Sequence, residues 1–144
     1  MLSRSRNARR AVVVGLGVAA LAAAGLVSNA LAGSGAAPTI KVVLKEWTLT
    51  PSTTTVPAGA VTFVVRNSGG IPHELVVVKT SRHHHALPMK GSQAVETGDV
   101  GEIEEILPGK TKRVTIKLKP GKYVLLCNLE GHYRAGQYAS LTVR

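Results

Sequence analysis

Short runs of β-branched and aromatic residues, separated by glycine and proline, make up the sequence from Thr39 onward. In residues 113–118 polar and apolar side chains alternate, which is typical of a strand with one buried and one solvated face. Residues 75–78 and 123–127 are continuously apolar, which predicts central strands buried on both faces. Residues 80–101 are largely polar, and we expect a long excursion with at most a little helix. Because no segment has convincing amphipathic helix periodicity, the pattern predicts an all-β sandwich or barrel of seven or eight strands.

The N-terminal segment has the three parts of an export signal. Four arginines lie within the first ten residues, residues 11–27 are uncharged and apolar, and residues 30–32 read Ala-Leu-Ala. This arrangement predicts a secretory signal peptide at residues 1–32. The alternative is an uncleaved membrane anchor, although the apolar run is short and rich in alanine and glycine for a membrane span.

The predicted cleavage point divides the chain into a signal segment at 1–32, a short linker at 33–38 and a domain at 39–144. The 112 residues after the signal segment are enough for one compact domain. We expect an exported protein that is periplasmic, on the cell surface or extracellular. An uncleaved N-terminal segment would also associate it with a membrane.

The chain is basic. Of its 18 Lys and Arg residues four lie in the signal segment, whereas all 8 Asp and Glu residues lie after it, which leaves a net charge of +6. Such a surface favours anionic partners or anionic membrane surfaces. Nucleic acid is not expected as a partner, because aromatic side chains for base stacking are only 3% of the residues. Six basic residues cluster at 110–122, which we interpret as the solvated face of a hairpin.

The single cysteine, Cys127, opens the sequence CNLEGHYRAGQY. Outside the cytoplasm cysteines usually form disulfide pairs, so a lone thiol is oxidised, paired between chains or held by a metal. Cys127 ends a buried strand, and a short turn that contains Gly131 leads to His132. Gly136 allows another close approach, and Gln137 begins the final strand. A thiolate, an imidazole and a weak oxygen donor therefore come from one loop.

A further ligand must come from elsewhere in the chain, and His73 fits because it follows Pro72 and opens a central strand. Two imidazoles, one thiolate and a weak axial ligand describe a blue-copper electron-transfer site. Thiolate and imidazole suit both Cu(I) and Cu(II), and a rigid β scaffold limits rearrangement when an electron arrives. The sequence therefore predicts a copper site in this protein.

The segments IPHELVVVKT and PGKYVLLCNLEGHYRAGQY resemble the cupredoxins, the plastocyanin- and azurin-like small blue copper proteins. The resemblance covers residues 39–144 and implies a Greek-key β-sandwich or barrel with one copper ion that cycles between Cu(I) and Cu(II). It implies that His73, Cys127 and His132 are the equatorial ligands. The usual fourth ligand of the family is methionine, whereas this sequence has Gln137, similar to the plant stellacyanin-like cupredoxins.

The resemblance also implies that the ring edge of His132 reaches the surface and passes electrons. An apolar rim would surround it, including Ile71, Pro72 and Leu129. Asn67 and Asn128 are predicted to make the hydrogen bonds that steady such sites.

Three functions are compatible with these features. The first is an exported one-electron carrier between redox proteins, whose partners have an acidic docking surface. The second is an extracytoplasmic copper carrier or buffer, and the third is a metal-free interaction domain in which Cys127 only packs. An enzyme is not expected, because nothing in the sequence resembles an oxyanion-hole motif and the thiol ends a buried strand.

Two further features lie in residues 80–101. His83, His84 and His85 are consecutive, and we expect an exposed polar loop tip; the alternative is an accessory copper or zinc site. Met89, the only methionine after the signal segment, is expected to be an ordinary loop residue.

Overall fold

Eleven β-strands and no helix make up residues 35–144, the part of the chain that the computed structural model describes. The predicted signal segment and the start of the linker lie outside these residues. Eight strands have four or more residues and three have two, so the predicted all-β architecture is confirmed. These described residues hold no helix that could cross a membrane. The strands are β1 (Thr39–Lys45), β2 (Thr48–Pro51), β3 (Thr55–Val56), β4 (Gly59–Asn67), β5 (His73–Lys79), β6 (Met89–Lys90), β7 (Gln93–Ala94), β8 (Asp99–Ile106), β9 (Thr111–Leu118), β10 (Gly121–Leu126) and β11 (Tyr138–Val143).

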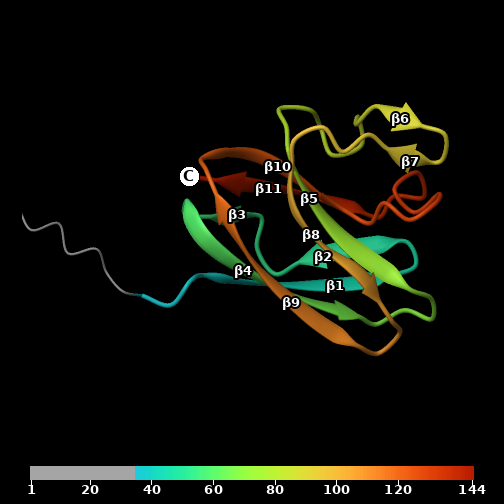
Figure 1. Ribbon diagram of the computed structural model, residues 1–144, viewed down its shortest axis with the longest axis horizontal. Coiled ribbons are helices and arrows are strands. Elements are labelled where there is room, and N and C mark those ends of the chain that lie inside the picture. The colour runs from blue at the N-terminus through green and yellow to red at the C-terminus, as the bar shows by residue number, and fades with distance from the viewer. Residues whose placement is uncertain (1–34) are drawn as a thin grey trace, which may run out of the picture. The chain divides into compact units, whose positions relative to one another are not determined.

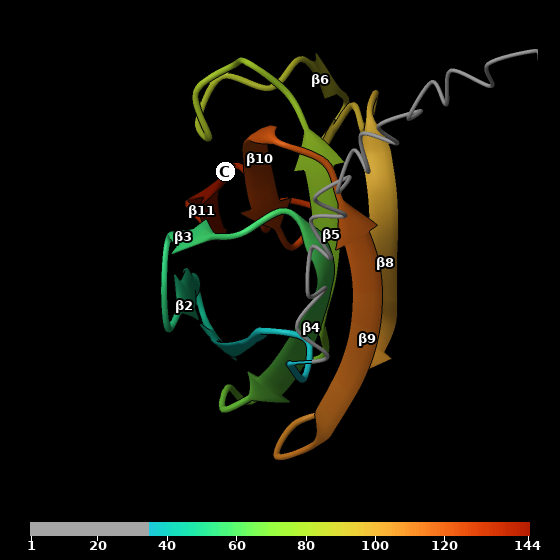
Figure 2. The same cartoon turned by 90° about the vertical axis from the view of Figure 1, so that its left-hand side faces the viewer.

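Two larger sheets face each other in a sandwich (Figures 1 and 2). One sheet has the strand order β2-β1-β4-β9, and the other has the order β3-β11-β10-β5-β8. β1 pairs with β4 and β3 pairs with β11 in parallel, whereas the other pairs are antiparallel. A separate two-stranded sheet consists of β6 and β7.

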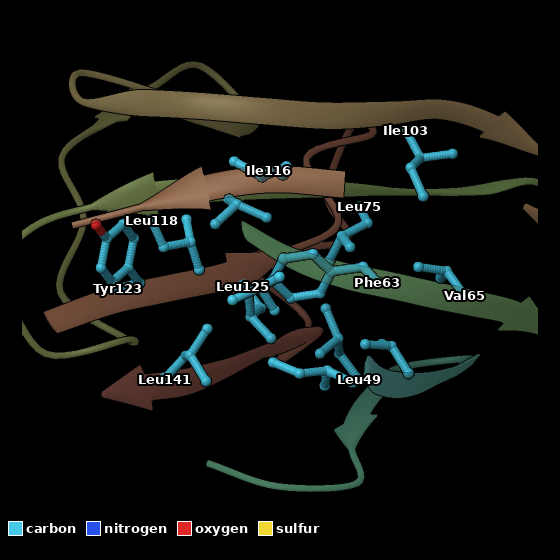
Figure 3. Packing of buried hydrophobic residues seen from close by; sticks show 14 of the residues in the cluster. Leu49, Phe63, Val65, Leu75, Ile103, Ile116, Leu118, Tyr123, Leu125 and Leu141 are labelled. Carbon is cyan, nitrogen blue, oxygen red and sulfur yellow. The ribbon is translucent and has the colours of Figure 1, made fainter. Parts of the chain in front are cut away.

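The main core lies between the two larger sheets. Phe63 of β4 belongs to the same buried cluster as Leu75 of β5 and Leu125 of β10, which come from the opposite sheet (Figure 3). All three side chains are 0% exposed, and each such burial stabilises the fold by about 1.5–3 kcal/mol. Strand β1 shows the underlying pattern, because its buried and exposed residues alternate without interruption.

A second apolar cluster covers the outer face of β5 and β10. Val76, Val78, Val124 and Leu126 point away from the main core and pack with side chains from the excursion and from the β10–β11 loop, namely Leu87, Ala94 and Tyr133. This second layer explains why β5 and β10 are apolar on both faces, as the unbroken apolar runs predict. The excursion itself contains the β6–β7 hairpin and the start of β8, and it has no helix among its described residues.

The strand pairing brings distant parts of the sequence to one end of the sandwich. β5 and β10 are antiparallel neighbours, with Val76 opposite Leu126, so the start of β5 lies beside the end of β10. The β1–β2 turn, the β4–β5 loop and the β10–β11 loop all lie at this end, on the right in Figure 1. The predicted metal ligands belong to these strand ends and loops.

Candidate metal centre

His73, Cys127 and His132 converge at this end of the sandwich. His73 begins β5, Cys127 follows the last residue of β10, and His132 lies in the loop that leads to β11. The Sγ atom of Cys127 lies 3.9 Å from Nδ1 of His73 and 3.3 Å from Nδ1 of His132. The two Nδ1 atoms are 3.3 Å apart. Ligands that share one first-row metal ion at about 2.0–2.3 Å have separations of this size.

Backbone hydrogen bonds fix the loop that carries two of these side chains. The N–H of Cys127 donates to the carbonyl of Gln137 at 3.1 Å, and the N–H of Gln137 donates to the carbonyl of His132 at 3.2 Å. Gly131 has a φ of 79°, in the left-handed region that favours glycine. Gly136 also has a positive φ, of 108°, but a Cβ there would meet no atom nearer than 3.8 Å. Its conformation, rather than the predicted close approach, therefore requires glycine.

Burial controls the charge state of two of the candidate ligands, Cys127 and His73. It raises the pKa of the Cys127 thiol to about 11, although the N–H of Glu74 donates to Sγ at 3.3 Å and lowers it. Burial also lowers the pKa of His73, and the neighbouring His132 lowers it further when it is charged. The Cys127 thiol and the His73 imidazole are therefore neutral at pH 7 when no metal is bound. A bound cation reverses this for the thiol, because a coordinating cysteine is deprotonated, while neutral imidazole is already the ligating form.

Gln137 contributes a buried amide whose oxygen has no protein partner. Its side chain is 0% exposed, and Nε2 donates to the carbonyl of Lys45 at 2.9 Å and lies 3.1 Å from Nδ1 of His73. Oε1 is buried without a hydrogen bond. An unpaired buried acceptor costs about 1–3 kcal/mol. A metal ion in contact with this oxygen would remove that cost, so the residues present fit a site with a weak oxygen ligand.

Residues 17–138 match the sequence profile of the cupredoxin-like domain family. The chain belongs to that family. Copper, as Cu(I) or Cu(II), is the one metal ion of this cupredoxin, and the thiolate and imidazole donors that converge at this end of the sandwich suit both oxidation states.

This cupredoxin is similar to two curated relatives and to a solved structure. The copper-resistant cuproprotein CopI of Rubrivivax gelatinosus is 31% identical over 109 residues, which are 74% of this chain and 66% of CopI. The iron uptake system component EfeO of Yersinia pseudotuberculosis is 34% identical over 94 residues, which are 64% of this chain but only 20% of EfeO. The chain thus spans less than two thirds of either relative.

The solved structure is that of dithionite-reduced auracyanin from Roseiflexus castenholzii. It is 25% identical, with a TM-score of 0.59, and the match covers 76% of this chain and 99% of auracyanin. The prediction of a cupredoxin fold is therefore confirmed by both sequence and structure.

Two asparagines brace the ligand loops of this cupredoxin. Asn67 is 0% exposed, and its Nδ2 donates to the carbonyls of Ile71 and Ile106 at 2.7 Å each, while its Oδ1 accepts from the N–H of Gly69 at 2.8 Å. This side chain holds the loop that leads into His73.

Asn128 plays the corresponding part beside Cys127. Its Oδ1 accepts from the N–H of Ala94 at 2.7 Å, and its Nδ2 donates to the Ala94 carbonyl at 2.9 Å and to Glu96 Oε1 at 2.6 Å. Its backbone N–H donates to Glu74 Oε1 at 2.9 Å. The residue after the thiol is therefore tied both to β5 and to the excursion.

The surface around His132 differs from the prediction. His132 is only 8% exposed, and Trp47 packs against its ring with the ring centroids 5.0 Å apart and the planes at 72°. Of the predicted rim, Ile71 and Pro72 are exposed and Leu129 is half-buried. The sequence reasoning missed Trp47, which looked like one more residue of a strand. No sequence signal singles out Trp47, because its position beside His132 arises from strand pairing and tertiary packing.

The contacts of Glu46 were also not predicted from the sequence. Its carboxylate accepts from the N–H groups of Gly70 and Ile71 at 2.8 and 3.1 Å, which ties the β1–β2 turn to the β4–β5 loop. Its Oε1 lies 3.4 Å from Nε2 of His73, an ion-pair distance without the alignment of a hydrogen bond. A hydrogen bond from its own backbone N–H, together with those from Gly70 and Ile71, lowers the pKa of Glu46. A sequence pattern could not show this, because the partners lie more than twenty residues away.

The three consecutive histidines do not form a comparable cluster. Among the described residues, only His73, Cys127 and His132 form a group of three such ligands that could share a metal ion. The rings of His83 and His85 are stacked, and Nδ1 of His84 lies 2.7 Å from the Ser140 hydroxyl. Met89, in β6, is 38% exposed.

Proposed function

We propose that this cupredoxin is an exported one-electron carrier whose copper ion is held by His73, Cys127 and His132, with Oε1 of Gln137 as a fourth, weak ligand. The observation that carries the proposal is the spacing of 3.3–3.9 Å among one sulfur and two nitrogens. Copper supplies the one-electron chemistry when it is bound. The orphaned Oε1 supports the fourth assignment.

The chain's own residues hold the site rigidly and exclude water from it. His73 begins β5 and Cys127 follows β10, two neighbouring strands inside a five-stranded sheet, and Asn67 and Asn128 fix the adjoining loops. The ligand side chains are 0–8% exposed, so little water can reorganise when the charge of the site changes. We propose a carrier rather than an enzyme, because this arrangement favours fast electron exchange and leaves the ligands covered.

Repeated redox cycling in the presence of a Cu(I) chelator, bicinchoninate, tests the electron-carrier proposal. The copper-loaded protein is reduced with ascorbate and reoxidised with ferricyanide, and its visible absorption is followed. An electron carrier recovers its absorption in every cycle. Loss of copper to the chelator at each reduction would contradict the proposal and support the second candidate, an extracytoplasmic copper carrier or buffer. The name of CopI, a copper-resistance protein, favours that second candidate.

We propose that the redox partner presents an acidic docking surface. The outward face of the β2-β1-β4-β9 sheet carries five basic side chains, and none of its described outward residues is acidic. These residues are Lys41, Lys45, Arg66, Arg113 and Lys117. Such a surface attracts anions at a rate that falls with salt. The rate of reduction by ferrocyanide should therefore fall as ionic strength rises and should fall in Lys45→Glu. A rate that is insensitive to both changes would contradict the proposed acidic docking surface of the partner.

We also propose that residues 1–32 direct export of the protein. The exported protein would lie in the periplasm, on the cell surface or outside the cell. The mass of the protein recovered from its native host tests it. A chain that begins at residue 33 supports cleavage, whereas a full-length chain in the membrane fraction supports the anchor.

A further inference from the structure

Trp47 is the only tryptophan of the chain, and it lies in the turn between β1 and β2. Its side chain is 45% exposed, whereas the His132 ring beneath it is 8% exposed. The ring centroids are 5.0 Å apart, in an edge-to-face arrangement at 72°. The indole therefore covers the ligand that would otherwise reach the surface.

The turn that carries Trp47 is held from both sides by the site. Nε2 of Gln137 donates to the carbonyl of Lys45 at 2.9 Å and makes a longer contact of 3.4 Å with the carbonyl of Thr48. The carboxylate of Glu46 accepts from two N–H groups of the β4–β5 loop. The residues before and after the indole are thus fixed to elements that carry His73 and Gln137.

An aromatic side chain with this exposure has two explanations. One is packing, since an edge-to-face aromatic pair contributes about 0.5–1.5 kcal/mol. The other is contact with another protein, because tryptophan is enriched among the residues that dominate binding energy at protein interfaces. The position of Trp47 favours contact with another protein. The indole lies directly on the His132 ring, and a second exposed apolar side chain, Ile71, lies on the loop that Glu46 binds.

We propose that Trp47 is the contact residue through which this cupredoxin exchanges electrons with a one-electron redox protein that presents an apolar patch within its acidic docking surface. The inference rests on the proposed electron-carrier function. Bound copper would supply the one-electron couple, with the indole and the His132 ring between it and the partner's redox group. The single electron lost by one centre would be gained by the other. No atom is transferred, and Trp47 itself is neither oxidised nor reduced overall.

The electron self-exchange rate between reduced and oxidised copies of the protein tests the proposal without an identified partner. It is measured by NMR line broadening at high ionic strength, which screens the positive charge. In Trp47→Ala the rate should fall about tenfold or more, as expected when an interface aromatic is truncated. Trp47→Phe should restore most of it. Val100→Ala removes another exposed apolar side chain, 38% exposed, and should leave the rate unchanged.

Two other readouts separate contact from structure. The reduction potential and the visible spectrum of Trp47→Ala should match those of the wild type, since the ligands are untouched. The tryptophan emission of the wild type should fall when Cu(II) binds, because the only indole lies on a ligand ring, and it should not fall in Cys127→Ser.

An unchanged self-exchange rate in Trp47→Ala, with copper bound and cycling reversibly, would overturn the contact role alone. A shifted potential or spectrum in Trp47→Ala would also overturn it, because Trp47 would then be structural. A wild-type protein that loses its copper on reduction would instead refute the electron-carrier function.

Discussion

At the scale of single residues, Gln137, the proposed fourth ligand, is expected to set the redox balance of the site. Its amide oxygen is harder than a methionine sulfur and therefore favours Cu(II) over Cu(I). Gln137→Met should raise the reduction potential by more than about 60 mV, the shift that accompanies a tenfold change in relative affinity for a one-electron couple. Protein-film voltammetry measures this directly. An unchanged or lowered potential would refute Gln137 as the fourth ligand.

Cys127 makes the stability of the metal-free protein sensitive to alkaline pH. Burial raises its pKa from 9.0 to about 11, so above pH 9 the unfolded chain releases a proton that the folded chain retains. The stabilisation that the raised pKa of Cys127 gives to the folded state is complete below pH 9 and is lost as pH rises through 11. Between pH 8 and pH 10.5 the free energy of unfolding should fall by about 2 kcal/mol more in the wild type than in Cys127→Ser. Urea denaturation across this range measures the difference, and parallel pH curves would contradict the burial argument.

At the scale of elements, the β4–β5 loop depends on one side chain. Asn67→Ala removes three hydrogen bonds and leaves the carbonyls of Ile71 and Ile106 and the N–H of Gly69 without that partner. We expect the metal-free protein to lose about 2–4 kcal/mol of stability, measured by urea denaturation. Gln93→Ala is the matched control, since this exposed amide makes one bond, to the Asn128 carbonyl, and should cost about 1 kcal/mol. Equal losses in both variants would contradict the bracing role of Asn67.

The main strands could be predicted from the sequence because each follows a local rule. Alternation marked β9, and continuous apolar runs marked β5 and β10 as central strands. The reason for their two-sided burial could not be predicted, because Leu87 and Ala94 reach β5 and β10 only through tertiary packing. The short strands β6 and β7 escaped prediction for the same reason, since two residues carry no period.

At the scale of the whole molecule, the candidate site was predictable where chemistry restricts the residue types. A lone thiol in a chain with an expected export signal, with a histidine nearby, has few uses, and this pointed to Cys127 and His132. A tryptophan or a glutamate can serve many purposes, so its residue type did not reveal the role of Trp47 or Glu46. Their roles arise from the pairing of β1 with β4, which sets the β1–β2 turn beside the β4–β5 loop. The charge distribution is a property of the same scale. The strand β8 at the edge of one sheet carries four acidic residues, whereas the outward face of the other sheet is basic.

A Cu(II) titration of the metal-free mature protein, followed by visible absorption, tests most directly whether His73, Cys127 and His132 share one copper ion. We expect an intense blue or green thiolate-to-copper band that saturates at one copper per chain and is absent in Cys127→Ser. Replacing His83, His84 and His85 with alanine should leave this stoichiometry unchanged. A wild-type protein that binds copper without the band, or a Cys127→Ser variant that retains it, would contradict the assignment.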